Sequence, residues 1–555
     1  MRSILRSHTG SVCLGLTIAL FYSAACGSSP APPNASTEQS RNDDGGQSSL
    51  PIALPGNDDG GDASAIAEDA SPLEDGDAGA VGAADPNGVY IAPTGSDSAA
   101  GTAAAPFATI KEGVAIASAE KRTLYVCAAT FTENVLITSG ITIDGGYDCA
   151  NGWAPTTNFA NIAPSSGVPL TINSGSAPVS ISNVKTKAPD NYASSGSSIG
   201  AFVVNSTAVV LQHVQLTSGN AGDGEPAAPP STQTTPAPSG ANGASLPDFG
   251  CTPGEGGECN GIASGGNATN DGCYGQGGVG GNGGDVVTGM APETGGVGLP
   301  TSSGGQGGPA NASNGQGAGL PGSIGITGSA GSPATSGIGT VTAAGYVASN
   351  SGSGGSPGQA GGGGGGGAGG YSGSSGQLCS IDFLGGGGGQ GGFGGCGGPG
   401  GAGGSAGGAS IALLTFNSAV QLSDAILNTG NGGDGASSTE GAAGQPGGQG
   451  GPGGAGSHGD NAGGDCTNSS TSGNAYGGGP GGQGGKGGAG GPGGGGPSIG
   501  ILAMNTAPQV STATYNVGSG GSGGTAITGP DATDGQTGEL VVLGTGAGAQ
   551  WRKGE

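Results

Sequence analysis

The sequence is poor in aromatic residues, basic residues and uninterrupted apolar runs, and each shortage excludes a class of protein. Aromatic residues make up 4% and hydrophobic residues 33% of the 555 residues, so any core must be built from short apolar segments. Lysine and arginine number 11 against 37 aspartate and glutamate, which gives a formal net charge of −26. No basic residue lies between Lys187 and Lys486. Because nucleic-acid binding depends on Lys and Arg that neutralise phosphates, we expect no nucleic-acid partner.

Residues for catalysis are also scarce. The only histidines are His8, His213 and His458. No H-E-x-x-H or C-x-x-C motif occurs, and Lys185 and Lys187 are the only basic residues between residues 151 and 485. Nucleophilic and lyase chemistry therefore have little to draw on. We predict a protein that is not an enzyme, with no catalytic residues, no metal and no cofactor.

What the sequence has instead is glycine. The 138 glycines and 35 prolines together make 173 of 555 residues, about 31%, which is typical of low-complexity sequence. The glycine spacing is irregular, which excludes collagen. Residues 391–404 and 477–496 have a G-G-x texture. A period near three suits extended, left-handed polyglycine-II-like helices whose glycine faces let neighbours approach closely, and disorder is the alternative.

The first 25 residues form a predicted signal peptide. Arg2 and Arg6 supply a positive start, and residues 11–22 form an apolar run too short to span a bilayer. Small residues then precede Cys26. This N-terminus resembles a bacterial lipoprotein signal, in which the cysteine becomes the lipid-carrying first residue of the mature chain. The resemblance implies lipidation at Cys26 and a membrane as partner.

Residues on either side of this cysteine refine the expectation. Ser23 stands where the lipoprotein motif most often has leucine, so cleavage after Ala25 by the general signal peptidase remains an alternative. Gly27 stands where an inner-membrane retention signal usually has aspartate. The resemblance therefore implies passage to the outer membrane or cell surface.

Residues 26–86 have the composition of a tether. Twelve acidic residues and the single base Arg41 lie among Ser, Ala, Pro and Gly. Such a segment buries too little apolar area to offset its ordering entropy, and its charge extends it. We expect a disordered acidic linker.

Patterned sequence begins near residue 87. Phe107, Ile110, Val114 and Ala117 follow at helical spacing behind Pro106, which predicts one amphipathic helix. Short β-branched runs separated by turn residues come next, and they predict strands at 123–127, 134–137 and 141–144. Short strands with frequent turns suit one winding of a solenoid.

A motif in the same region carries a family resemblance. The pattern consists of Val89, Gly95-Ser96-Asp97, Gly101-Thr102 and Pro106-Phe107-Ala108-Thr109-Ile110, followed by Leu124-Tyr125-Val126 and Phe131-Thr132-Glu133-Asn134-Val135. It resembles the N-terminal cap of pectin-lyase-like right-handed parallel β-helix proteins over residues 88–150. The resemblance implies an all-β solenoid that begins with a capping helix.

An internal repeat supports a solenoid independently. Residues 198–206 recur as 410–418 and 498–506 with Ser, Ile and Asn at identical spacing, and a weaker copy begins at residue 170. A unit of this size cannot bury its own face, so its repetition implies stacking. The conserved offset predicts a ladder of stacked Asn173, Asn205, Asn417 and Asn505, and the alternative is that Asn is only a favourable turn residue.

Successive Asn residues are 417 − 205 = 212 and 505 − 417 = 88 positions apart, and glycine-rich sequence fills the excess. We therefore predict insertions carried on a β-helix; they resemble the PGRS-type glycine-rich domains of bacterial surface proteins. The predicted parts are a signal peptide (1–25), the acidic tether (26–86), the cap and first coils (87–224), an insertion (225–406), a coil (407–435), a second insertion (436–496) and the last coil with the C-terminal end (497–546).

Eight cysteines besides Cys26 remain in the predicted mature chain. They are Cys127, Cys149, Cys251, Cys259, Cys273, Cys379, Cys396 and Cys466. An exported chain is expected to oxidise its thiols, so all eight are disulfide candidates. Their pairing does not follow from sequence.

Acidic residues offer two weak metal-site hypotheses. Residues 280–287 match one calcium-binding nonapeptide, but no second copy follows, and such a motif needs ligands from successive turns. Asp223 and Asp434 occupy equivalent positions in two repeats, where turn capping is the alternative to a carboxylate site. We expect capping and no metal.

These patterns favour a non-catalytic, lipid-anchored surface protein with a structural, adhesive or matrix role. The alternative is a carbohydrate-active β-helix protein that binds or cleaves a polysaccharide. Besides the membrane, a surface polysaccharide or another cell-surface protein is the expected class of partner.

Lipidation gives the first testable prediction. Metabolic labelling with a fatty acid should tag the protein, and Cys26→Ser should abolish the tag because the acceptor thiol is gone. Equal labelling of the variant and the parent chain would refute lipidation at this site.

Overall fold

The computed structural model describes residues 85–246, 263–269, 272–283, 290–310, 317–348, 350–371, 373–374, 382–383, 385–456, 473–544 and 550–552. The predicted signal peptide, Cys26 and nearly all of the predicted tether lie outside these residues. Among the described residues, no helix is long and apolar enough to cross a membrane.

The protein is mostly β, with one helix, α1 (Ile110–Glu120), in the described ranges. The strands are β1 (Val89–Ile91), β2 (Thr123–Cys127), β3 (Thr130–Phe131), β4 (Val135–Ile137), β5 (Ile141–Asp148), β6 (Ala154–Pro155), β7 (Ala160–Ile162), β8 (Leu170–Ile172), β9 (Val179–Ser182), β10 (Val184–Lys187), β11 (Ser198–Val204), β12 (Val209–Thr217), β13 (Thr340–Thr342), β14 (Gly345–Val347), β15 (Gly373–Ser374), β16 (Asp382–Phe383), β17 (Ser410–Phe416), β18 (Val420–Asn428), β19 (Ser498–Met504), β20 (Gln509–Val510), β21 (Ala513–Asn516), β22 (Thr537–Leu543) and β23 (Gln550–Arg552).

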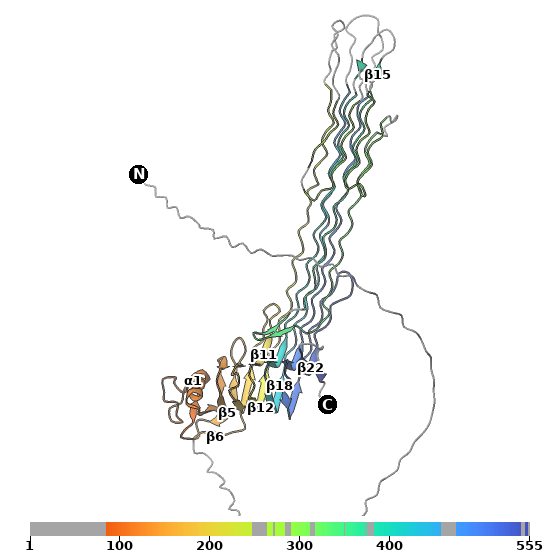
Figure 1. Ribbon diagram of the computed structural model, residues 1–555. Helices are drawn as coiled ribbons and strands as arrows, with labels where there is room; N and C mark the ends of the chain where they lie inside the picture. The colour runs from red at the N-terminus through yellow and green to blue at the C-terminus, as the bar shows by residue number, and fades with distance from the viewer. Residues whose placement is uncertain are drawn as a thin grey trace, which may run out of the picture. The chain divides into compact units, whose positions relative to one another are not determined.

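Most strands belong to two parallel sheets (Figure 1). The 12-stranded sheet has the order β1-β2-β5-β9-β12-β10-β7-β3, with β18 beside β12, β20 and β21 beside β18, and β6 beside β5. The 7-stranded sheet has the order β23-β22-β19-β17-β11-β8-β4. The chain alternates between them, because β11, β17 and β19 lie in the second sheet and are followed by β12, β18 and β20 in the first. An all-β, parallel architecture is therefore confirmed.

The sequence repeats are neighbouring strands. Ile199 pairs with Ile411, and Ile411 pairs with Ile499, in unbroken parallel register. The glycine-rich sequence between the copies therefore leaves the sheets and returns without disturbing the register. This outcome is physically reasonable, because the entropy cost of closing a loop grows only slowly with its length.

One core joins the two sheets. Ala201 and Leu413 of the 7-stranded sheet lie in the same buried cluster as Leu211 and Leu422 of the 12-stranded sheet. The opposite face of the 7-stranded sheet is buried as well, and its side chains pack with Val341 of β13. Burial on both faces explains why these strands are apolar without alternation.

Helix α1 covers the beginning of this core, and the predicted cap motif holds it there. Thr109 caps the helix by accepting the amide of Glu112. Asp97 accepts the amides of Ala108 and Thr109 at 3.0 and 2.9 Å. The carboxylate of Glu133 accepts the amides of Ile110 and Lys111. Carboxylates are favourable at a helix N-terminus, where amides lack partners.

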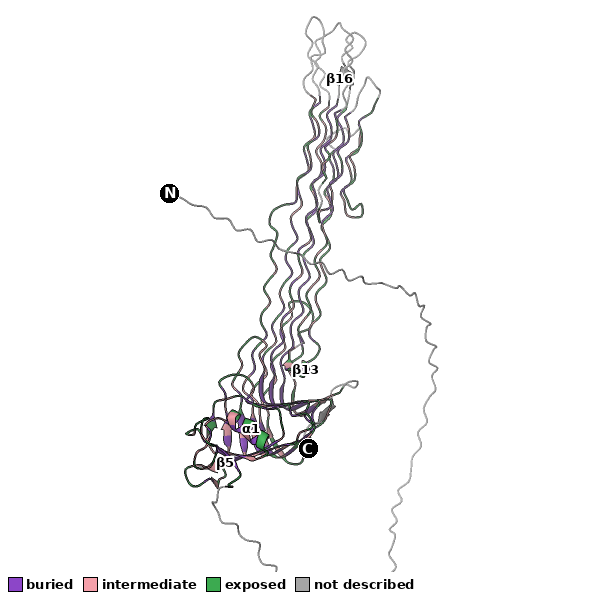
Figure 2. Ribbon diagram, turned by 60° about the vertical axis from the view of Figure 1, so that its left-hand side comes forward, coloured by how far each residue is buried: buried purple, intermediate pink, exposed green. Residues whose placement is uncertain are grey.

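The glycine-rich segments form what we call the glycine bundle: the described residues of 237–308, 317–334, 352–371, 385–407, 436–456 and 473–496. Its chains run side by side (Figures 1 and 2) and bond through every third residue. In one row of hydrogen bonds, the amides of Gly355, Gly358 and Gly361 donate in turn to the carbonyl oxygens of Gly401, Gly398 and Gly395, at 2.8, 2.9 and 2.8 Å. Between the bundle and the sheets the same kind of backbone bond continues, since Gly408 donates to Gly222 at 2.8 Å.

Glycine is required in the bundle for close approach rather than for a special backbone angle. No described glycine of the bundle has a positive φ. A Cβ at Gly401 would lie 2.1 Å from the carbonyl oxygen of Thr439, and one at Gly398 would lie 2.1 Å from that of Ala442. The side chain of Ala402, by contrast, is exposed. The G-G-x texture thus places glycine where backbones touch and other residues where they do not.

Candidate functional site

Three of the four predicted ladder asparagines form a hydrogen-bonded chain at one corner of the parallel sheets. Asn417 donates its amide to Asn205 Oδ1 at 3.4 Å, and Asn505 donates to Asn417 Oδ1. All three have left-handed backbones, with φ of 47°, 50° and 72°. Asn tolerates this conformation better than most residues. The side-chain amides therefore link three successive turns to one another.

Asn173 does not belong to this ladder, which corrects the expectation from sequence. A parallel bridge pairs Gly175 with Ser206, so Asn173 is in register with Val204 rather than Asn205. In this unit Gly175 has the left-handed backbone, with φ of 61°. The left-handed residue of this unit therefore lies one position beyond Ser174, the residue in register with Asn205.

A second ladder, which the sequence analysis missed, crosses the bend of the 12-stranded sheet. Asn183, His213 and Asp424 have φ of 59°, 47° and 48°. The amide of Asn183 donates to Asp144 at 2.7 Å, its oxygen lies 2.6 Å from His213 Nδ1, and the Tyr147 hydroxyl donates to Asp144 at 2.7 Å. The equivalence of His213 and Asp424 in two repeats was a signal that could have revealed it.

This second ladder orients the imidazole. The Asn183 amide nitrogen faces Asp144, so its oxygen accepts the proton of His213 Nδ1, and Nε2 is left 4.0 Å from Asp424. Burial, together with the hydrogen bond to Asp144, raises the pKa of Tyr147 above its ordinary value. The arrangement holds the imidazole in one orientation at a half-exposed surface.

Asp223 and Asp434 bond to the backbone of the next unit rather than to that of their own turn. Asp223 Oδ1 accepts the amide of Asp434 at 2.8 Å, and Asp434 Oδ1 accepts the amide of Ser522 at 2.6 Å. These carboxylates therefore link successive units through the backbone. In the described part of the chain, no group of three or more His, Cys, Asp or Glu could hold a metal ion.

The calcium-binding nonapeptide match at residues 280–287 falls partly within the glycine bundle. Gly281 donates its amide to Gly367 at 2.8 Å, and Gly283 donates to Ala263 at 3.0 Å. These backbone groups bond to neighbouring chains. Asp285, the residue that would supply a carboxylate, lies outside the described residues.

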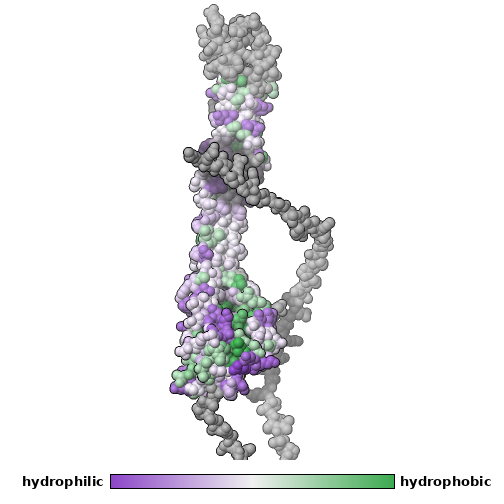
Figure 3. Space-filling model, turned by 90° about the vertical axis from the view of Figure 1, so that its left-hand side faces the viewer, coloured by the Kyte–Doolittle hydropathy of each residue, from purple (hydrophilic) through white to green (hydrophobic). Residues whose placement is uncertain are grey.

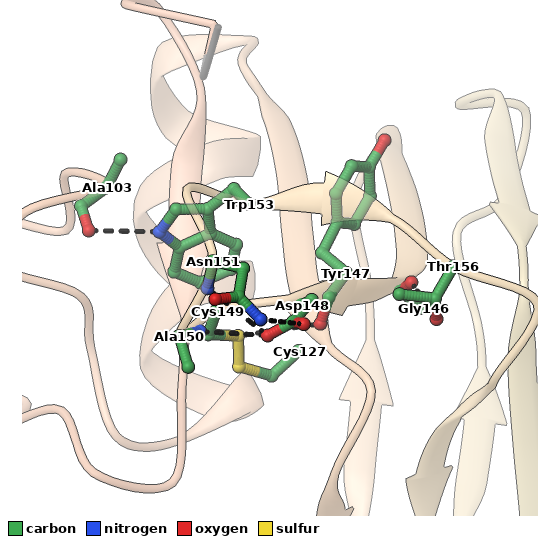
Figure 4. The surroundings of a disulfide bond; sticks show 10 residues. All are labelled: Ala103, Cys127, Gly146, Tyr147, Asp148, Cys149, Ala150, Asn151, Trp153 and Thr156. Carbon is green, nitrogen blue, oxygen red and sulfur yellow. Dashed lines mark hydrogen bonds between the residues drawn. A yellow bond between two sulfur atoms is a disulfide. The ribbon is translucent and has the colours of Figure 1, made fainter. Parts of the chain in front are cut away.

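Two disulfides involve predicted cysteines. Cys127 at the end of β2 pairs with Cys149 after β5 (Figure 4). Beside it, hydrogen bonds from Asn151 and from backbone amides lower the pKa of Asp148, and Trp153 Nε1 donates to Ala103 O at 3.0 Å. This disulfide links the end of β2 to the turn that follows β5.

The other disulfide lies in the glycine bundle. It joins Cys273 to Cys396, which are 123 residues apart, and Cys396 is buried. Near it, segment 275–283 lies beside residues 385–394, where Gly391 donates its amide to the carbonyl oxygen of Gly278 at 2.9 Å. Cys251, Cys259, Cys379 and Cys466 lie outside the described residues.

A groove of about 860 Å³ crosses the outer face of the 12-stranded sheet. Its floor takes outward side chains from successive strands, among them Thr142, Ser180 and Gln421, and Lys121 and Arg122 lie at one end. Polar and apolar side chains gather over the sheets, while the glycine bundle has a surface close to neutral hydropathy (Figure 3). A groove that follows successive strands suits an extended ligand with hydroxyl groups.

Comparisons with family models, with curated proteins and with solved structures found no match to this chain.

The asparagine ladder gives a prediction about stability. Asn417→Ala should lower the free energy of unfolding by about 1–3 kcal/mol, because it loses amide hydrogen bonds and strains a left-handed backbone. Asn417→Gly should cost less but still be measurable, since only the hydrogen bonds are lost. Denaturant titration followed by circular dichroism would measure both.

Asn173→Ala is the matched control and should have little effect, because Asn173 is exposed and outside the ladder. Wild-type stability of Asn417→Gly would show that only the turn conformation matters.

Proposed function

We propose that the chain is a non-catalytic surface protein of the right-handed parallel β-helix type, with the glycine bundle as its structural and adhesive element. It is held at the outer membrane or cell surface by a lipid on Cys26. The fold that the cap motif resembles, the pectin-lyase-like solenoid, is part of this proposal.

Support for a solenoid comes from the path of the chain. Strands alternate between the two parallel sheets, equivalent repeat residues are stacked in register, and α1 covers one end. Corner positions bond from unit to unit through Asn205, Asn417 and Asn505. Stacked units that contact only their neighbours are the general construction of solenoids.

One observation carries the functional proposal: the glycine bundle is ordered by its own backbone. Gly398, Gly401 and Gly404 each donate to a glycine of residues 485–491, at 2.9, 2.8 and 2.9 Å. Such rows hold the chains at fixed spacing without a hydrophobic core, and the exposed positions remain available for contact. A glycine bundle that is held together by backbone hydrogen bonds and has a surface close to neutral in hydropathy suits a structural or adhesive role better than catalysis.

The bundle gives a prediction that compares the same substitution at a packed glycine and at an exposed alanine. Gly401→Val should loosen the bundle, because its Cβ would lie 2.1 Å from the Thr439 carbonyl oxygen. The same change at the exposed Ala402 should be mild. Limited proteolysis of residues 225–406 and 436–496 would report the order, and attachment of expressing cells to one another or to a surface would report the function.

We expect Gly401→Val to reduce both protection and attachment while Ala402→Val keeps both. Identical behaviour of the two variants would refute the packed bundle, and normal attachment by an unprotected Gly401→Val bundle would refute its adhesive role.

A second candidate function, polysaccharide binding, is favoured by the groove across the 12-stranded sheet. Thr142, Ser180 and Gln421 place hydroxyl and amide groups among the apolar residues that line it, a mixture that fits a neutral glycan. Lys121 and Arg122 would favour an acidic sugar at one end. His213 lies on the same sheet, but it is not one of the residues that line the groove.

A glycan-binding and degradation screen of the full chain tests this candidate. If the groove binds glycans, Gln421→Trp should weaken binding by filling the floor, whereas Gln212→Trp, on an exposed strand position outside the groove lining, should leave it unchanged. Release of products from any polysaccharide would overturn the non-catalytic proposal.

A further inference from the structure

The two ends of the stacked sheets differ in how they are covered. At the first end, α1 places Ile110, Val114 and Ala117 in the core. At the last end, β23 pairs with β22 and closes the edge of the 7-stranded sheet. Strand β21, at the last edge of the 12-stranded sheet, pairs with β18 and with no other strand in the described part of the chain.

The pairing of β21 leaves one side of its backbone unused. The carbonyl groups of Thr512 and Asn516 accept amides of Ala425 and Thr429, so they point toward β18. Because successive residues of a strand direct their backbone groups to opposite sides, those of Ala513, Tyr515 and Val517 point away from the sheet. A row of donors and acceptors is therefore open at this edge.

The sequence of this edge lacks the usual protection. Residues 509–517 read QVSTATYNV and contain no charge, no proline and no glycine, although the whole chain carries −26. Natural edge strands are commonly guarded by charged residues, prolines or bulges. Val, Thr and Tyr favour strands, and the segment itself brings no charge to the pairing; the nearest charge that acts on it is Glu539, which together with burial raises the pKa of Tyr515.

Apolar side chains at the same end are only partly covered. Val510, Ala513, Tyr515 and Leu540 pack against the core but stay half-buried, and Val510 and Leu540 line a hollow of about 550 Å³. A partner at this edge would complete both the hydrogen bonding and the apolar contact. The edge is its own complement under a two-fold axis, because antiparallel strands exchange hydrogen bonds reciprocally.

We propose that β21 is a homodimer interface, in which it pairs antiparallel with β21 of a second copy around a two-fold axis at Tyr515. This register places Ala513 opposite Val517 of the other copy, and Thr514 opposite Asn516. Because α1 covers the other end, association stops at two copies. The dimer does not depend on the proposed adhesive role, since it uses the sheets and not the glycine bundle.

Sedimentation velocity of the full chain carrying Cys26→Ser, which removes the proposed lipid, tests the interface. We expect a dimer at micromolar concentration. Thr514→Lys with Asn516→Lys brings like charges face to face and should raise the dissociation constant at least about tenfold. Thr142→Lys with Gln212→Lys adds the same charge at exposed positions on inner strands, away from the hollow, and should leave the dimer intact. A monomeric parent chain, or an edge variant that dimerises normally, would overturn the proposal.

Cross-linking checks the register without depending on loss of binding. Thr514→Cys mixed with Asn516→Cys should form a disulfide-linked heterodimer on mild oxidation, because directly opposite residues have Cβ atoms about 5 Å apart. Each variant alone should cross-link much less. Equal cross-linking in all three samples would refute antiparallel pairing centred on Tyr515.

Discussion

Close contact between backbones is the constraint on which this structure depends. In the glycine bundle, amide and carbonyl groups of neighbouring chains bond directly, and the distances leave no room for a Cβ: one at Gly366 would lie 2.0 Å from the carbonyl oxygen of Val279. Ordinary cores exclude water with side chains, whereas here the main chain fills the interior. Such an interior stays in register only if glycine recurs at fixed positions.

The ends of the bundled segments follow from the same constraint. Segment 275–283 lies beside residues 361–369, and there a Cβ at Gly363, Gly366 or Gly369 would collide with its carbonyl oxygens. At the same three-residue spacing, the preceding positions are Ala360, Pro357 and Gly354. A Cβ at Gly354 would have its nearest neighbouring atom at 3.5 Å. The row therefore changes from glycine to bulkier residues where the adjacent chain stops.

The parallel sheets and the bundle stabilise each other through their shared chain. Strands β11 and β17 are neighbours although the first insertion separates them. The chain leaves β12 through Asp223, whose carboxylate accepts the backbone amide of the equivalent Asp434 in the next unit. Corner residues with left-handed backbones, such as Asn417 and His213, add side-chain bonds between units. The sheets fix where the glycine chains begin and return, and the chains need that common origin to align.

The sequence by itself determined the elements and their order, because they depend on local pattern. Apolar spacing located α1, the nine-residue repeat predicted that β11, β17 and β19 are stacked, and the G-G-x texture marked the close-packed segments. Only the tertiary structure decided which residues meet. It paired Cys127 with Cys149 and Cys273 with Cys396, put Gly175 instead of Asn173 at the turn, and brought Asp144, Asn183 and His213 together. These contacts depend on register between strands far apart in sequence, and register follows from packing of the whole stack rather than from any local pattern.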